Sequence, residues 1–177
     1  MSYYDDIYEI AVDNHGYVST ETASEIGVPA VELAKLAHRG RLENISRGLY
    51  RLVRFVPTEN DSYAEAVARL GGDAYLFGES VIAMLGLAPA NPSYICVATP
   101  HRTRRKLPAY IRVKKPGESD TVTSYDGIPS QDVATAVRSA KATMMDERLQ
   151  DAVEEARRQG YLRRDDYESL KKDMGWK

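Results

Sequence analysis

The chain has 177 residues, of which 43% are hydrophobic, and its 24 lysines and arginines nearly balance its 26 acidic residues. This length and hydrophobic content suit a globular protein of one ordinary domain or two compact ones. The formal net charge of -2 argues against a protein that coats nucleic acid with its whole surface, so the distribution of charge carries more information than its sum.

The N-terminal part of the chain predicts three short helices. Apolar residues recur at helical spacing over residues 3–14, 19–26 and 30–39, and each run is closely followed by a glycine that can end a helix. The side chains expected to face the core from the third helix are Val31, Ala34 and either Leu36 or Ala37. A short turn with a glycine separates the second and third helices, which is typical of a helix-turn-helix.

Beyond the third helix, the spacing of apolar residues changes from helical to alternating. Leu42, Ile45, Leu49 and Leu52 are separated by polar residues and glycine, as in a two-stranded hairpin. A hairpin after a helix-turn-helix forms a wing. Residues 1–57 are therefore predicted to form a winged helix-turn-helix domain.

A second domain is predicted over residues 62–177. The preceding segment, residues 57–62, is polar, contains a proline and interrupts both spacings, so we take it as the boundary. Helices are expected over residues 63–70, 80–87, 130–141, 145–159 and 165–174, and strands over 94–98, 109–114 and 121–125, with Pro89 and Pro92 following the second of these helices. The predicted fold class is α+β, with a mixed α/β second domain that ends in helices.

Positive charge is concentrated on the third helix and the wing. From Lys35 to Arg54 the chain has six lysines and arginines and one carboxylate, Glu43, whereas the preceding helices are acidic. Lysines and arginines that neutralise DNA phosphates release counterions, which supplies most of the sequence-independent affinity. The segregation predicts DNA binding; the alternative is an ordinary solvated face of mixed charge.

The candidate DNA contacts follow from the chemistry of the outward residues. The N-terminal part of a recognition helix enters the major groove, where alanine can contact a thymine methyl, glutamate can accept a hydrogen bond from cytosine, and lysine can reach guanine or a phosphate. Arginines of the wing are expected at phosphates or in the minor groove. The candidates are Ala30, Glu32, Lys35, His38 and Arg39 on the third helix and Arg41, Arg47 and Arg51 after it.

A second basic surface is predicted in the second domain. No acidic residue occurs from His101 to Lys115. The basic residues of this segment, besides His101, are Arg102, Arg104, Arg105, Lys106, Arg112, Lys114 and Lys115. They can extend a DNA footprint, bind a second nucleic acid or dock an acidic partner. Alternatively, they form a solvated loop or pair with the acidic C-terminal helices.

The sequence offers no catalytic or metal-binding constellation. Its three histidines are far apart and its one cysteine stands alone, so no zinc-site spacing exists. The glycines form neither a dinucleotide-binding fingerprint nor a phosphate loop. Ser80 lacks the second glycine of a nucleophile elbow and is expected to cap a helix. We therefore expect no enzyme, no metal and no cofactor.

A cytoplasmic location is expected. No run approaches the roughly 18 apolar residues of a membrane span, and the first residues are acidic, where a secretory signal is basic and then apolar. Cys96 lies in an apolar run and is expected to be buried, with a reactive thiol as the less favoured alternative.

The order of motifs resembles a known family. Residues 16–27 and 36–50 resemble the winged helix-turn-helix of AbiEi-type antitoxins from bacterial type IV toxin-antitoxin systems, with Arg47-Gly48-Leu49-Tyr50 in the wing as the most characteristic piece. The segments of the second domain that resemble the family are residues 78–87, 95–100, 104–105 and 126–129. Two departures are Phe77-Gly78-Glu79, where members often have serine and histidine before the glutamate, and the unmatched helices after Met145.

The resemblance implies a transcriptional repressor that binds double-stranded DNA at inverted repeats in its own promoter, as a homodimer on the DNA. It also implies an antitoxin whose second domain opposes a co-encoded nucleotidyltransferase-like toxin, with or without direct contact. Two alternatives remain at this point. One is an interaction module that docks an acidic partner through residues 101–115, and the other is an enzyme that acts on nucleic acid.

Overall fold

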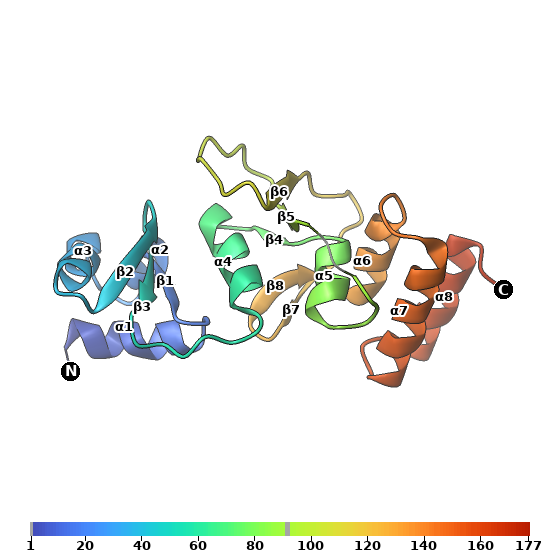
Figure 1. The fold of residues 1–177 in the computed structure, drawn as a ribbon, viewed down its shortest axis with the longest axis horizontal. Helices are drawn as coiled ribbons and strands as arrows, with labels where there is room; N and C mark the ends of the chain where they lie inside the picture. The colour runs from blue at the N-terminus through green and yellow to red at the C-terminus, as the bar shows by residue number, and fades with distance from the viewer. Residues whose placement is uncertain (1, 91–92) are drawn as a thin grey trace. The chain divides into compact units, whose positions relative to one another are not determined.

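The computed structural model describes residues 2–90 and 93–177 and divides the chain into two compact units, Met1–Gly71 and Gly72–Lys177 (Figure 1). Both units contain helices and strands, so the predicted α+β class is confirmed. Pro92, expected to follow a helix of the second unit, lies outside the described residues. Among the described residues, no helix is long and apolar enough to cross a membrane.

The first unit begins as the predicted winged helix-turn-helix. Its elements are α1 (Tyr3–Val12), β1 (Tyr17–Ser19), α2 (Thr20–Glu25), α3 (Ala30–His38), β2 (Leu42–Ser46) and β3 (Leu49–Leu52). The strands form an antiparallel sheet in the order β1-β3-β2, in which β2 and β3 are the wing. The Ser19 hydroxyl caps α2 by accepting a hydrogen bond from the backbone N–H of Thr22 at 3.1 Å, as expected of a serine before a helix.

The buried face of α3 differs from the prediction. Leu33 is fully buried and Leu36 is nearly so, as predicted for Leu36, whereas Val31 is 56% exposed and Ala34 is exposed. Leu33 and Leu36 are three residues apart, as are Val31 and Ala34, so either pair could form one face of the helix. The two leucines are buried because they remove more apolar area from water than a valine and an alanine. The prediction for Val31 and Ala34 was therefore wrong, and both side chains are free for the outer surface.

A close approach at Gly16 joins the start of β1 to the end of the wing. Gly16 has φ +85, and a Cβ at this position would lie 2.7 Å from Cγ of Phe55. Its carbonyl oxygen accepts a hydrogen bond from the N–H of Leu52 at 2.9 Å. Only glycine suits this backbone conformation and this space.

Helix α4 (Asp61–Leu70) belongs to the first unit by its contacts. The Tyr17 hydroxyl on β1 donates to Glu65 at 3.0 Å, and Arg51 on β3 pairs with Asp61 at 2.6 Å. The boundary expected from the sequence precedes this helix, whereas the division between the units follows it. Side-chain bonds of this kind leave no trace in the hydrophobic spacing.

The second unit is built on a mixed sheet. Its strands are β4 (Tyr75–Leu76), β5 (Ile95–Ala98), β6 (Ile111–Lys114), β7 (Val122–Tyr125) and β8 (Ile128–Gln131), in the order β6-β5-β4-β8-β7. Strands β5 and β6 are parallel, as are β4 and β8. The sequence predicted neither β4 nor β8, and the helix expected from residue 130 begins only at Val133.

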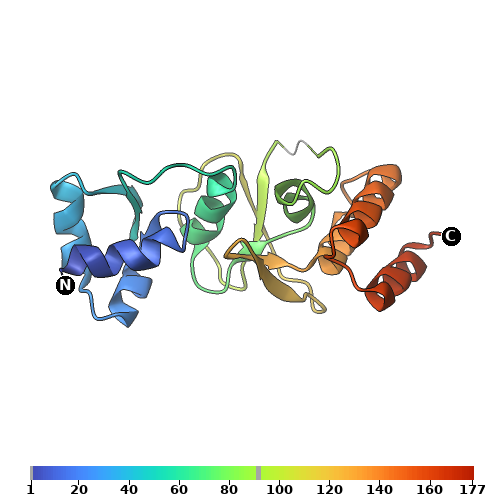
Figure 2. The same cartoon turned by 90° about the horizontal axis from the view of Figure 1, so that it is seen from below.

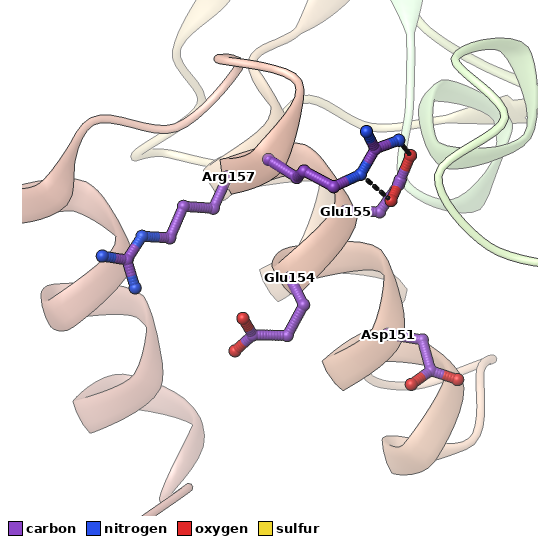
Figure 3. Close-up of a pocket in the computed structure, with 5 residues that line it drawn as sticks. Asp151, Glu154, Glu155 and Arg157 are labelled. Atoms are coloured by element: carbon purple, nitrogen blue, oxygen red, sulfur yellow. Dashed lines mark hydrogen bonds and ion pairs between the residues drawn. The ribbon is translucent and has the colours of Figure 1, made fainter.

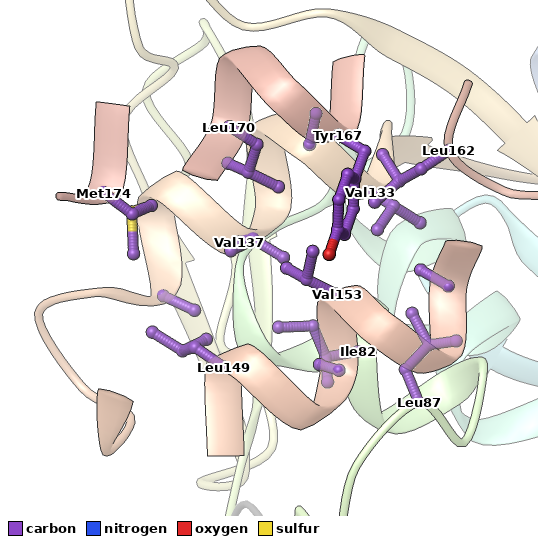
Figure 4. Close-up of a cluster of buried hydrophobic side chains, with 14 residues drawn as sticks. Ile82, Leu87, Val133, Val137, Leu149, Val153, Leu162, Tyr167, Leu170 and Met174 are labelled. Carbon is purple, nitrogen blue, oxygen red and sulfur yellow. The ribbon is translucent and has the colours of Figure 1, made fainter. Parts of the chain in front are cut away.

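Helices supply a hydrophobic core of the second unit. They are α5 (Glu79–Met84), α6 (Val133–Ala140), α7 (Asp146–Arg158) and α8 (Arg164–Met174). In Figures 1 and 2, α6, α7 and α8 lie together, and Figure 4 shows Ile82, Val137, Leu149 and Leu170 from these four helices in one buried cluster. This packing accounts for the apolar spacing of the C-terminal segments.

Cys96 and Ser80 are structural residues. Cys96 on β5 is 4% exposed, which confirms the expected burial, and burial raises the pKa of its thiol. The fully buried Ser80 hydroxyl accepts a hydrogen bond from the Cys96 backbone N–H at 2.8 Å. Ser80 thus ties α5 to β5, and no side-chain bond to its own helix was found for the expected cap.

Candidate nucleic-acid interface

The outward face of α3 combines small apolar side chains with cations. Ala30, Val31 and Ala34 are exposed on it, and Lys35 and His38 follow one turn later. Pro29 precedes the helix and provides no side-chain cap, so backbone N–H groups of the first turn remain available to an anion. The face can therefore approach a groove closely and neutralise phosphates at its edge.

Two of the residues predicted to contact bases form an ion pair with each other. The Lys35 ammonium lies 2.9 Å from a Glu32 carboxylate oxygen, one turn earlier on α3. The Lys35 side chain is about half exposed and Glu32 is less so. An exposed pair of this type contributes little stability and exchanges readily for other partners. The Glu32 carboxylate partly offsets the charge of Lys35 and fixes its position near the helix.

Arg47 occupies the tip of the wing. It lies in the turn between β2 and β3 and is exposed. The next residue, Gly48, has φ +75, and its carbonyl oxygen accepts a hydrogen bond from the N–H of Thr20 at 2.9 Å. This bond anchors the wing tip to the start of α2. Arg47 is therefore presented from a supported turn.

Arg39 and Arg41 leave the end of α3 in different surroundings. Arg39 is the exposed C-cap residue of α3. The Arg41 guanidinium lies 4.7 Å from the centre of the Tyr4 ring on α1, in a cation–π contact. Arg41 is exposed, but this contact draws it toward the acidic N-terminus of α1, which makes it a weaker candidate than Arg39 for a phosphate contact.

Arg51 is placed differently from the expectation. Its guanidinium pairs with Asp61 at 2.6 Å, and the side chain is only 18% exposed. The rings of Tyr17 and Phe55 lie 5.4 and 5.8 Å from the guanidinium. These contacts hold β3 against α4, so we leave Arg51 out of the DNA-binding surface proposed below, and its predicted DNA contact stays a prediction.

The partner of Arg51 is a strongly held carboxylate. Burial alone would raise the pKa of Asp61, but hydrogen bonds from Thr58 and the charge of Arg51 hold that pKa below its ordinary value. The Thr58 hydroxyl lies 2.6 Å from one Asp61 oxygen, and His15 lies 3.5 Å from the same oxygen. This network joins Arg51 of the wing, Thr58 of the segment that follows the wing, and Asp61 of α4.

The second basic surface lies on β6 and on the loop that connects β5 to it (Figure 1). Of the predicted residues, Lys114 is half-buried; the exposed ones are Arg102, Arg104, Arg105, Lys106, Arg112 and Lys115. The Arg112 guanidinium lies 5.0 Å from the centre of the Tyr94 ring, and His101 lies 3.6 Å from Asp73. The structure thus gathers the predicted cations on one edge of the second sheet.

An open hollow on α7 has the composition of a solvated charged face (Figure 3). It is lined by Asp151, Glu154, Glu155, Arg157 and Arg158. Hydrogen bonds from Arg158 and Gln159 lower the pKa of the exposed Glu155 to about 2, which suits a permanently ionised surface group and not an acid catalyst. Over residues 2–90 and 93–177, no group of three or more histidines, cysteines or carboxylates is placed to hold a metal ion.

The comparisons with known proteins bear on the first unit. Residues 5–53 match the family model described as "Transcriptional regulator, AbiEi antitoxin", which confirms the resemblance over α1 to β3. A solved structure, that of the RV2827C protein from Mycobacterium tuberculosis, is 15% identical and is matched over 96% of this chain and 81% of that chain, with a TM-score of 0.38. This similarity is too distant to inform function. No curated protein sequence matches the chain.

Proposed function

We propose that this chain, whose first unit matches the AbiEi antitoxin transcriptional regulators, is a DNA-binding autorepressor and the antitoxin of an AbiE-like type IV system. The observation that carries the proposal is the outward face of α3, together with exposed Arg39 at its end and exposed Arg47 at the tip of the wing, all within the matched residues. Such a repressor acts in the cytoplasm, where its promoter is.

In this proposal, α3 lies in the major groove. Ala30, Val31 and Ala34 bring the helix close to the base edges, where their methyl groups favour thymine. Lys35 exchanges Glu32 for a guanine or a phosphate, and Glu32 becomes free to accept a hydrogen bond from cytosine. The helix thus supplies sequence preference at few positions, and affinity depends mainly on the surrounding cations.

Phosphate contacts surround the helix. His38 and Arg39 at the end of α3 and Arg47 on the wing are exposed on the same domain. Each neutralised phosphate contributes about 0.9 to the slope of log affinity against log salt concentration. With Lys35, these residues give a slope of about 3 to 4 for each bound copy, depending on the protonation of His38.

Two copies are expected on one operator. A helix-turn-helix that binds an inverted repeat places its two recognition helices about 34 Å apart, one turn of the duplex. The proposal therefore includes a homodimer that forms on DNA at inverted repeats upstream of the gene. The second unit is proposed to oppose a co-encoded nucleotidyltransferase-like toxin, and this part rests on the family alone.

The DNA-binding proposal is tested by an electrophoretic shift on the upstream region. Lys35→Ala combined with Arg47→Ala is expected to weaken binding strongly, and Arg148→Ala combined with Lys172→Ala on the exposed faces of α7 and α8 is a control of equal charge change. Equal binding by the two double variants would contradict the assigned surface.

The antitoxin proposal is tested in cells. Co-expression with the neighbouring nucleotidyltransferase-like gene is expected to restore growth, and the Lys35→Ala and Arg47→Ala variant is expected to do so as well, because neutralisation is proposed to use the second unit. Growth arrest despite full-length antitoxin would contradict this role. A pull-down in the same cells shows whether the toxin is contacted directly.

A further inference from the structure

The second unit carries an apolar hollow that the proposed function does not use. Its volume is about 480 Å³, and it is open to the surface. Ala74 before β4, Pro100 after β5, Pro116 after β6, Val122 on β7 and Pro129 on β8 supply most of its wall. These residues lie on or next to each strand of the sheet, so the folding of the sheet brings them together.

The polar groups of the hollow are already engaged. The Tyr75 hydroxyl donates a hydrogen bond to Asp120 at 2.6 Å, and the same Asp120 oxygen accepts one from the backbone N–H of Gly117 at 2.9 Å. Burial and the neighbouring Asp120 raise the pKa of Tyr75, so it stays neutral. The wall therefore offers contact area to an apolar group and few hydrogen bonds to a phosphate.

The exposed cations of the segment between Pro100 and Pro116, two residues of the wall, are what we call the basic rim of the hollow. Pro100 and Pro116 in its wall directly flank the acid-free segment from His101 to Lys115. Arg102 and Arg104 in the loop are exposed, as is Lys115 at the end of β6. Asp73 also lines the hollow and lies 3.6 Å from His101, so Asp73 and Asp120 are two acidic groups near these cations.

The edge of the sheet adds a further feature. Strand β6 is the outermost strand on this side, and its exposed Arg112 and half-buried Lys114 set like charges against any pairing with a second β6. An extended chain of opposite charge faces no such repulsion. Strand addition to an edge gains main-chain hydrogen bonds, and a neighbouring pocket selects a side chain.

We propose that the apolar hollow and its basic rim form a docking site for an acidic, extended polypeptide segment with one large apolar anchor residue. The anchor fills the hollow between Pro100, Pro116 and Val122, while carboxylates of the segment pair with Arg102, Arg104 and Lys115. A DNA duplex satisfies the cations but has no side chain for the hollow. The hollow is lined only by residues of the second unit, and the proposal does not require DNA binding by the first unit.

The test is a selection of displayed random dodecapeptides on the full-length protein, followed by fluorescence anisotropy with the enriched peptides. Acidic peptides with a conserved leucine, phenylalanine or tryptophan are expected. Arg102→Glu combined with Arg104→Glu is expected to weaken their binding about tenfold or more, because it turns two favourable charge pairs into repulsive ones. The matched control is Arg148→Glu combined with Lys172→Glu, which leaves binding unchanged.

A second variant separates the hollow from the rim. Val122→Gln is expected to weaken the same peptides about fivefold, since it places a polar group against the anchor. Met145→Gln, at an exposed methionine outside the hollow, is its control. Circular dichroism confirms that each variant is folded.

Three results would overturn the proposal. One is enrichment of peptides without acidic residues, or no enrichment at all. Another is peptide binding that is equally strong in Val122→Gln and in the wild type. The third is a mixed-sequence duplex without the operator that competes for the peptides and loses affinity in the Arg102→Glu and Arg104→Glu variant alone, which would assign the surface to nucleic acid.

Discussion

A matched pair of substitutions on α3 separates the role of its buried face from that of its outer face. Leu33 is fully buried and Val31, two residues earlier, is 56% exposed. Leu33→Ala removes a core side chain and is expected to lower the free energy of unfolding by about 2 to 5 kcal/mol. Val31→Ala is expected to change it by less than about 0.5 kcal/mol.

DNA binding is expected to separate the two variants in the opposite way. At a temperature where both are folded, Leu33→Ala retains operator affinity, because its outer surface is unchanged. Val31→Ala loses a methyl contact at the base edges, and a lost contact of this size weakens operator binding by about 1 kcal/mol. Binding to a mixed-sequence duplex, which depends on phosphates, stays the same.

Amide hydrogen exchange of the full-length protein measures the stability of the first unit separately from that of the second. Faster exchange across α1, α3 and β3 in Leu33→Ala, and not in Val31→Ala, is the expected result. A destabilised Val31→Ala, or a Leu33→Ala variant of unchanged stability, would refute the assignment of the two faces.

Three further substitutions test other parts of the first unit. Gly16→Ala places an alanine on a left-handed backbone, which costs about 1 to 2 kcal/mol, and its Cβ also displaces Phe55. Gly27→Ala has a similar φ and open space, so it shows the backbone cost alone. Equal losses of unfolding free energy for the two variants in chemical denaturation would refute the close approach. The folded-state pKa of Asp61 lies below its ordinary value of 3.8, so its ionised form stabilises the fold above about pH 4 and this contribution is lost as the pH falls. Asp61→Asn should therefore flatten the dependence of the unfolding free energy on pH below about pH 4. An unchanged pH dependence would contradict the pairing. Arg47→Ala should lower the salt slope of operator binding by about 0.9, and an unaltered slope would remove Arg47 from the interface.

The elements of the first unit could be predicted because local chemistry determines them. Ser19 caps α2, glycines with positive φ end the helices, and alternating apolar residues define the wing. What the spacing could not decide was which of two apolar stripes on α3 is buried. The larger volume of Leu33 and Leu36 was the signal that identifies the buried stripe.

The count of charged residues located the basic region, but it could not predict which partner each cation binds. Arg51 alternates with buried Tyr50 and Leu52 on β3, so its outward direction was predictable. Its partner Asp61 lies at the start of α4, ten residues further along the chain, within the segment predicted to be the domain boundary. Long-range ion pairs of this kind leave no periodic pattern in a sequence.

The second unit was less predictable because its sheet uses short strands. Strand β4 has only two residues, Tyr75 and Leu76, which is too short to show alternation. Strand β8 contains Pro129 and ends two residues before α6 begins. Its last residues were therefore predicted as the start of the helix that follows. The parallel pairings of β4 with β8 and of β5 with β6 join segments distant in the chain.

The central claim, that α3 enters the operator groove, can be tested by targeted DNA cleavage. Cys96, the one cysteine of the chain, is buried, so an iron chelate can be attached selectively to Ala34→Cys on the outer face of α3. Cleavage in two clusters about one duplex turn apart is predicted upstream of the gene. Ser169→Cys on the exposed face of α8 serves as the control. Absence of cleavage from Ala34→Cys, or the same pattern from both positions, would contradict the account.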